Sequence, residues 1–153
     1  MNLISGCCVF LLCLIVSKVI SEKFQKRADF YNGMMNFNTT LQNEISFKKT
    51  TLKSLVEKLD DNNDFNLVIK ERFNNNLTKI QIAYLKSEEI IFVKNYLSAL
   101  GVTDSQTQLN MIKTYGDKIL EYEKNAKDLA KKYVYLSAKL GFLSGSIGLI
   151  ILL

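Results

Sequence analysis

The residues whose types could support covalent or metal chemistry are few in this chain of 153 residues, and their spacing does not suit it. Histidine is absent, which removes the usual general base and the commonest metal ligand. The three cysteines, Cys7, Cys8 and Cys13, fall in one uncharged stretch and show neither metal-ligand spacing nor a disulfide pattern. We therefore expect a protein that is not an enzyme and that needs no metal or other cofactor.

Two further patterns could indicate a site. The adjacent Glu88 and Glu89 could form a carboxylate pair, but neighbouring side chains on a helix point about 100° apart, so we interpret them as a solvated charged face. The net charge of +5 could indicate a nucleic-acid partner. Arginine is limited to Arg27 and Arg72, however, and the lysines are interspersed with acids, so we expect no nucleic-acid binding.

The charged residues all lie between Lys18 and Lys139, which leaves two uncharged and mostly apolar ends. A helix needs about 20 apolar residues to cross the hydrocarbon layer of a bilayer. The sequence therefore predicts transmembrane helices over residues 1–20 and 133–153, with a polar domain over residues 21–132 between them. Lys139 lies inside the second span, and its long side chain can reach back to the interface near Tyr133 and Tyr135.

Basic residues flank both predicted spans on the side of the polar domain: Lys18, Lys23, Lys26, Arg27, Lys124, Lys127, Lys131 and Lys132. The positive-inside rule then predicts a two-pass protein of the cell membrane, with a cytoplasmic central domain and both termini on the opposite face. The flanking lysines also suit the anionic head groups of the lipid bilayer.

The first span could instead be a processed targeting signal. It has no basic residue before Lys18 and no clear cleavage site, so we expect an uncleaved anchor. The run Ile4-Ser5-Gly6-Cys7 looks like a bacterial lipoprotein box, although only six residues precede the cysteine. Whether Cys7 is ever lipidated stays open.

Helical periodicity dominates the central domain, and no alternating strand pattern of useful length is found. Two long apolar stripes are formed by Phe30, Met34, Phe37, Leu41 and Ile45, and by Ile112, Tyr115, Ile119, Tyr122, Ala126, Leu129 and Tyr133. Shorter helices are expected over residues 52–59 and 65–73, with a turn at 60–64 between them. One or two more are expected from the apolar residues over 77–84 and 91–100. Since both long helices start from the same membrane face, they predict an all-α fold, a helical bundle built on an antiparallel helical hairpin.

Residues around Gly101 carry the clearest helix boundary. Gly101 is placed to end one helix, and Thr103 with Gln106 three positions later predicts a capping box that starts the next. In the last span, Gly141 and Gly145 form a GxxxG pair, and Gly148 follows. These glycines could pack against the first span of the same chain or against another subunit in a homo-oligomer, and both alternatives are open.

Several segments in a fixed order resemble the stage III sporulation protein AB family of endospore-forming bacteria. They are LGVTDSQTQ at residues 100–108, Glu44-Ile45-Ser46-Phe47 followed by Thr50-Thr51-Leu52 and Leu55, and the tail KKYVYLSAKLGFLSGSIGLIILL. The similarity runs through nearly the whole chain. It implies the same layout, with two terminal membrane helices around a cytosolic helical domain.

The resemblance also implies a function and partners. The family is a non-enzymatic scaffold of the channel between mother cell and forespore, and its soluble part is similar to the cytoplasmic domains of the F-type platform protein of type II secretion. The implied partners are a cytosolic secretion-type ATPase, stage III sporulation protein AA, and other membrane proteins of the channel. The candidate docking residues are Leu100, Gly101, Thr103, Asp104 and Gln108, and the same residues could instead only shape the turn. The alternative function is a two-anchor membrane assembly or tether protein unrelated to sporulation, self-associating through its glycine-rich last helix.

Overall fold

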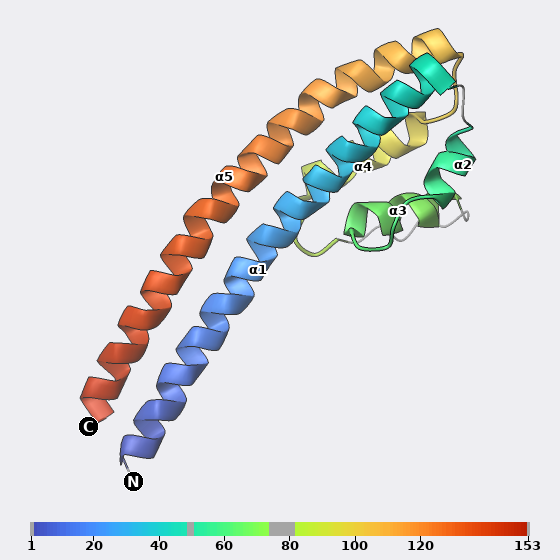
Figure 1. Cartoon of the computed structure of the whole chain (residues 1–153). Helices are drawn as coiled ribbons and strands as arrows, with labels where there is room; N and C mark the ends of the chain where they lie inside the picture. The colour runs from blue at the N-terminus through green and yellow to red at the C-terminus, as the bar shows by residue number, and fades with distance from the viewer. Residues whose placement is uncertain (1, 49–50, 74–81, 153) are drawn as a thin grey trace. The chain divides into compact units, whose positions relative to one another are not determined.

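Every regular element in the described part of the chain is a helix, as the sequence predicts. The computed structural model describes residues 2–48, 51–73 and 82–152, without the side chains of 2–6, 48, 149, 151 and 152. Its elements are α1 (Asn2–Asn43), a π-helical turn (Glu44–Lys48), α2 (Leu52–Glu57), α3 (Asp64–Phe73), α4 (Ser87–Ala99) and α5 (Ser105–Leu152) (Figure 1). The helix expected over 77–84 lies mostly outside the described residues, and residues 82–86 are not helical.

The chain divides into two compact units, and α1 and α5 contribute to both. The first unit contains Met1–Lys26 and Asn125–Leu153, and the second contains Arg27–Lys124. Among the described residues, no helix holds a stretch that is both long enough and apolar enough to cross a lipid bilayer.

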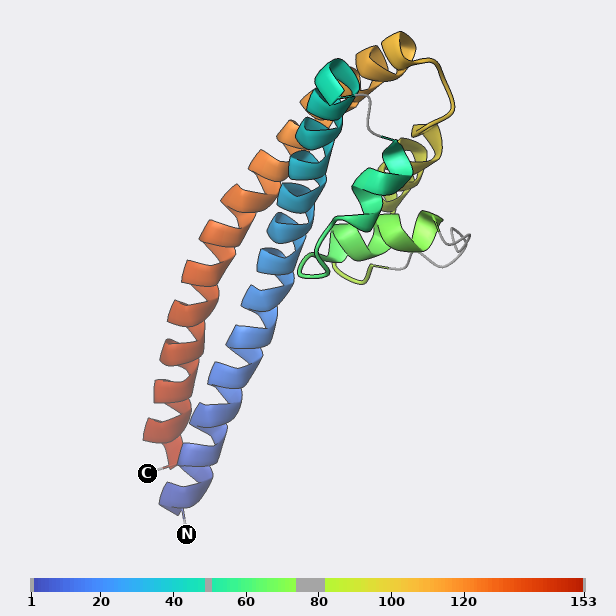
Figure 2. The ribbon, with the colours of Figure 1, turned by 45° about the vertical axis from the view of Figure 1, so that its right-hand side comes forward.

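The core of the second unit is formed where the apolar stripe of α1 meets α3, α4 and α5. Phe30, Met34, Phe37 and Leu41 of the predicted stripe are all buried, and so are Ile112 and Ile119 of the second stripe. They pack with buried side chains of the short helices, which are Phe65, Val68, Ile69, Val93, Tyr96 and Leu97. Figure 2 shows α2, α3 and α4, in green to yellow, gathered on one side of the α1 segment of this unit.

The turn predicted at residues 60–64 is confirmed over 60–63, Asp64 being the first residue of α3, and Asn63 stabilises it. The side-chain oxygen of Asn63 accepts a hydrogen bond from the backbone of Phe65 at 2.8 Å, which starts α3. Its amide nitrogen donates to the carbonyl of Asp29 on α1, also at 2.8 Å. A β-carbon at Gly33 would overlap the Asn63 amide, so the glycine leaves room for this contact.

The first unit is an antiparallel pair formed by the two outer helix segments. Phe24 of α1 stacks on Tyr133 of α5, with ring centroids 4.2 Å apart and planes 3° apart. About one turn closer to the chain end on each helix, the hydroxyls of Ser21 and Ser137 share a hydrogen bond of 2.6 Å. Large apolar side chains of both helices are exposed around this pair: Leu11, Leu12, Ile15, Val16, Val19, Leu140, Phe142, Leu143 and Ile147.

Candidate functional site

The turn between α4 and α5 contains four of the five candidate docking residues, and the fifth, Gln108, lies at the start of α5. α4 ends at Ala99, and Gly101 has a φ of +77°, the left-handed conformation that favours glycine. The prediction that Gly101 ends this helix is confirmed.

The start of α5 differs from the capping box predicted at Thr103. α5 begins at Ser105, and the side chain of Asp104 accepts hydrogen bonds of 3.1 Å from the backbone N–H groups of Gln106 and Thr107. A carboxylate serves this position better than a hydroxyl, because it carries negative charge at the positive end of the helix dipole. The hydrogen bonds from Thr107 and Gln106 hold the pKa of Asp104 below its ordinary value.

Gln108 connects the two sides of the turn. Its side-chain oxygen accepts hydrogen bonds from the backbone N–H of Gly101 at 3.0 Å and from the hydroxyl of Thr103 at 3.4 Å. Its amide nitrogen is buried and makes no hydrogen bond to any described residue. The main role of Gln108 is therefore to stabilise the conformation of the turn by hydrogen bonds.

The remaining candidates divide between the interior and the surface. Leu100 is buried, and its carbonyl accepts a hydrogen bond of 2.9 Å from the guanidinium of Arg72. Gly101, Thr103 and Asp104 are exposed, together with Val102, which is 72% exposed. Only the exposed part of the turn offers side chains that a partner could contact directly.

A buried ion pair between Arg27 and Glu89 corrects the interpretation of Glu89 as part of a solvated face. Arg27 Nη2 lies 2.6 Å and Nε 3.1 Å from Glu89 Oε1, and the two residues are 7% and 2% exposed. Glu89 Oε2 also accepts a hydrogen bond of 2.8 Å from the backbone N–H of Lys86, at the start of α4. Glu88, in contrast, is exposed.

The environment of Glu89 keeps it charged. Burial by itself would raise the pKa of its carboxyl group, but the hydrogen bonds and positive charge of Arg27 and the backbone of Lys86 outweigh burial, so the pKa lies below its ordinary value. In the sequence, Arg27 follows the first predicted span together with Lys18, Lys23 and Lys26, which predicts that it flanks the membrane as they do. The structure separates it from them, because its side chain is buried and cannot reach lipid head groups.

Tyr31 completes this buried cluster. Its ring stacks on Tyr122 with centroids 5.3 Å apart, and its hydroxyl makes no hydrogen bond to any described residue. Burial and the negative charge of Glu89 both raise the pKa of Tyr31. A neutral phenol beside a permanently paired carboxylate cannot act as an acid or a base near neutral pH, so the cluster is structural.

Sequence reasoning missed this pair, although one signal pointed to it. Arginine is rare in a chain in which lysine is common, and its planar fork is preferred where a carboxylate is held by two parallel hydrogen bonds. The other arginine, Arg72, is likewise used internally, at the carbonyl of Leu100. Scarce arginines in a lysine-rich chain are therefore candidates for internal structural contacts.

The glycines of the last predicted span face α1 of the same chain. A β-carbon at Gly141 would lie 2.8 Å from Ser17 Cβ, one at Gly145 would lie 2.5 Å from the Phe10 ring, and one at Gly148 would lie 3.1 Å from Val9. The absence of side chains at these positions thus allows α5 to lie close to α1 within the first unit.

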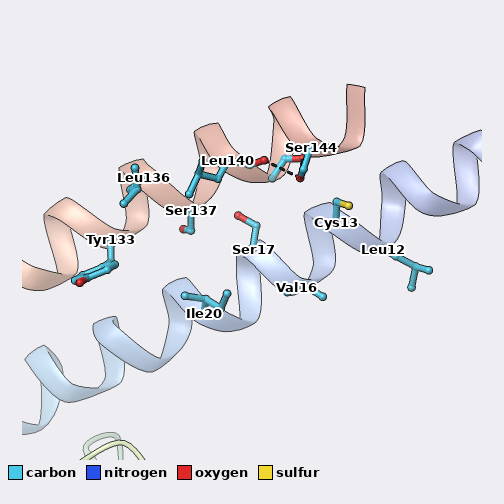
Figure 3. Close-up of a pocket in the computed structure, with 11 residues that line it drawn as sticks. Leu12, Cys13, Val16, Ser17, Ile20, Tyr133, Leu136, Ser137, Leu140 and Ser144 are labelled. Atoms are coloured by element: carbon cyan, nitrogen blue, oxygen red, sulfur yellow. Dashed lines mark hydrogen bonds between the residues drawn. The ribbon is translucent and has the colours of Figure 1, made fainter. Parts of the chain in front are cut away.

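Beside this close contact lies an open apolar groove of about 550 Å³. Figure 3 shows Leu12, Val16 and Ile20 of α1 along one wall of the groove and Leu136 and Leu140 of α5 along the other. Ser17 and Ser137 point into the space between the helices, and Ser144 donates a hydrogen bond of 2.7 Å to the carbonyl of Leu140 (Figure 3). The described residues that line the groove include no charged side chain, so it can accommodate apolar groups.

No group of acidic or cysteine side chains suited to holding a metal ion is found in the described ranges. Two exposed features could contact a partner: the turn at residues 101–104, and the surface of the first unit.

The sequence matches one family model. The model for stage III sporulation protein AB covers residues 60–153, from just before α3 to the last residue. No curated protein and no solved structure matches the chain.

Proposed function

The chain belongs to the stage III sporulation protein AB family, and from this membership we propose that it is a non-enzymatic, membrane-anchored scaffold of the channel between mother cell and forespore. The observation that carries the proposal is the family match, which includes the whole of α4 and α5 and the turn between them. A role in sporulation follows from the family, and the scaffold role is our extension of it.

We propose further that the first unit lies in the cell membrane as a two-pass hairpin. Support comes from the uncharged ends of the sequence before Lys18 and after Lys139, and from the exposed apolar side chains of both helix segments. The structure does not describe the side chains of part of each predicted span, namely residues 1–6 in the first and residues 149 and 151–153 in the second. In this arrangement the second unit lies in the mother-cell cytoplasm and both termini lie on the opposite face.

The turn between α4 and α5 is the proposed docking site for a cytosolic ATPase of the stage III sporulation protein AA type. Its shape is held from inside by Gln108 and by the Arg72 contact to Leu100, so its exposed residues are presented in a fixed conformation. Val102 supplies an exposed apolar side chain and Asp104 a negative charge. Preorganisation of this kind lowers the entropy lost when a partner binds.

Self-association through the glycines receives less support from the structure. Gly141, Gly145 and Gly148 are covered by α1 of the same chain, so they are not free to contact a second copy. We therefore keep the sporulation scaffold as the single proposed function.

Co-purification of the full-length chain with the ATPase tests the proposal. Detergent-solubilised membranes that contain both proteins should yield a complex, and extraction with alkaline carbonate should leave the chain in the membrane pellet. A chain that remains in the pellet but never binds the ATPase would contradict docking alone, whereas a chain released by carbonate would contradict the membrane arrangement.

A further inference from the structure

We propose that one face of the first unit is a binding site for an anionic phospholipid, with Lys18 and Lys139 holding its head group. The inference rests on the proposed membrane arrangement and adds a ligand to it. We call this face the lysine face and define it by Leu14, Lys18, Tyr135, Lys139, Phe142 and Leu143.

The lysine face consists of two adjoining hollows, one between α1 and α5 and the other on the surface of α5 alone. One has a volume of about 520 Å³ and includes Leu14 and Lys18, and the other has a volume of about 550 Å³ and includes Tyr135 and Lys139. Ala138 and Phe142 line both hollows, so the two are continuous. The two lysines therefore border one continuous surface, with Ala138 and Phe142 between them.

The chemical character of the face changes along the helices as an amphipathic lipid requires. Because the two helices are antiparallel, Leu14 of α1 lies closer to the chain ends than Lys18, and Leu143 of α5 lies closer to them than Lys139. The opposite end of the face is lined by Ser21, Glu22 and Gln25, which are polar. Acyl chains would contact Leu14, Phe142 and Leu143, while the head group would lie beside the lysines.

Both ammonium groups are available to a ligand. Lys139 Nζ lies 4.3 Å from the centre of the Tyr135 ring, a cation–π contact that orients the side chain without neutralising its charge. The Lys18 side chain is 79% exposed, and its contact with Glu22 is long, at 4.0 Å. Exposed pairs of this kind are weak, so Glu22 reduces the attraction for an anion but does not cancel it.

Charge favours a lipid over the other occupants of such a face. A second copy of the same face would bring lysines against lysines, and like charges repel in a medium of low dielectric constant. The groove on the other side of the helix pair (Figure 3) is lined by no charged residue among those described, so a lipid with a negative head group should prefer the lysine face.

The test uses the full-length chain in nanodiscs of equal phosphatidylcholine and phosphatidylglycerol, followed by native mass spectrometry of the lipids that remain bound. Bound lipid should be enriched in phosphatidylglycerol, and each of Lys18→Gln and Lys139→Gln should lower the enrichment about fivefold. Glu22→Gln should raise it. Lys131→Gln is the matched control, because Lys131 is exposed on the same helix and lines neither hollow.

Each other outcome overturns the inference. Equal binding of the two lipids, or an equal loss in Lys131→Gln, would show diffuse attraction instead of a site. Displacement of the lipid by millimolar inorganic phosphate would show that the apolar part of the face plays no role. A chain absent from the nanodisc fraction would overturn the membrane arrangement as well, whereas insertion without lipid preference would overturn this inference alone. Circular dichroism of each variant checks that the helices are intact.

Discussion

Arg27 and Glu89, which are 62 positions apart in the sequence, form a buried ion pair in which the guanidinium contacts both carboxylate oxygens, with Nε 3.1 Å from Oε1 and 3.3 Å from Oε2. The pair ties α1 to the first turn of α4, where Glu89 also accepts from the backbone N–H of Lys86. One carboxylate thus performs two tasks, since it neutralises a buried cation and satisfies an N–H group at a helix start.

Removal of one partner of this pair should destabilise the second unit strongly. Glu89→Ala leaves the Arg27 charge buried and unpaired, so we expect a loss of about 3 to 5 kcal/mol in the free energy of unfolding. Urea unfolding of the full-length chain in detergent, followed by circular dichroism, measures it. The double variant Arg27→Met with Glu89→Leu should recover most of the loss, because it removes both charges. A cost of less than about 1 kcal/mol for Glu89→Ala would show that the pair is in effect solvated.

The same pair should make stability fall in acid. The pKa of Glu89 in the folded chain lies below its ordinary value of 4.5, so as pH falls through that value the unfolded chain binds a proton before the folded chain does. The contribution of Glu89 is therefore complete above the ordinary value and is lost as pH falls through the lower, folded-state pKa. Glu89→Gln should be less stable at neutral pH and should show a flatter decline between about pH 5 and 3. Parallel curves for the two proteins would contradict the assignment.

Most of the fold could be predicted from local patterns in the sequence. The buried stripe from Phe30 to Leu41 follows from helical spacing, and the helix end at Gly101 follows from the conformational freedom of glycine. Both features depend on residues within a few turns of each other. The resemblance to the sporulation family likewise rested on short segments in a fixed order, and the family match confirms it.

The features that could not be predicted depend on contacts between distant segments. The solvated interpretation of Glu89 failed because only the folded chain brings α4 beside Arg27. The contact of Asn63 with Asp29, which Gly33 makes possible, has the same origin. The capping box predicted at Thr103 was wrong for another reason. Thr103 and Asp104 are both residue types that cap helices well, and the backbone conformation places the Asp104 side chain, not that of Thr103, at the start of α5.

The pairing of α1 with α5 in the first unit can be tested by a disulfide. The hydroxyl oxygens of Ser21 and Ser137 are 2.6 Å apart, so cysteines at these two positions should form a disulfide within one chain. The variant is made after replacement of Cys7, Cys8 and Cys13 by alanine. On a non-reducing gel it should run as a compact monomer. Disulfide-linked dimers would mean that the helices pair between subunits. The control pair is Ser21→Cys with Tyr135→Cys, because Tyr135 is exposed and lines only the hollow on α5.

Variants of Asp104 separate a capping role from partner contact. Asp104→Asn keeps a side-chain acceptor for the N–H groups of Gln106 and Thr107, so the melting temperature should change little, whereas Asp104→Ala should lower it by a few degrees. Co-purification with the ATPase is the second measurement. Loss of the complex in Asp104→Asn with an unchanged melting curve would indicate contact through the charge. Full binding by Asp104→Lys would exclude Asp104 from the interface.

The buried Tyr31 and Tyr96 and the half-buried Tyr84 should make the second unit unfold cooperatively at alkaline pH. The pKa values of Tyr31, Tyr84 and Tyr96 all lie above the ordinary value of 10.0, chiefly because burial disfavours the phenolate, with added effects from Glu89 at Tyr31 and Asp64 at Tyr84. Their contribution to stability is complete below pH 10 and is lost as the pH rises beyond it, because the unfolded chain then releases protons that the folded chain retains. Absorbance at 295 nm should therefore show a late phase that coincides with the loss of helical circular dichroism.

Two conservative variants sharpen this last test. Tyr31→Phe removes a hydroxyl that makes no hydrogen bond to any described residue, so it should shrink the late phase with little change in stability at neutral pH. Tyr96→Phe removes the hydrogen bond of 3.1 Å that the Tyr96 hydroxyl donates to Asn38, so it should cost about 1 kcal/mol. Equal effects of the two variants would mean that the Tyr31 hydroxyl has a partner in solution, and the carboxylate of Glu89 would be the first to examine because its charge already acts on the pKa of Tyr31.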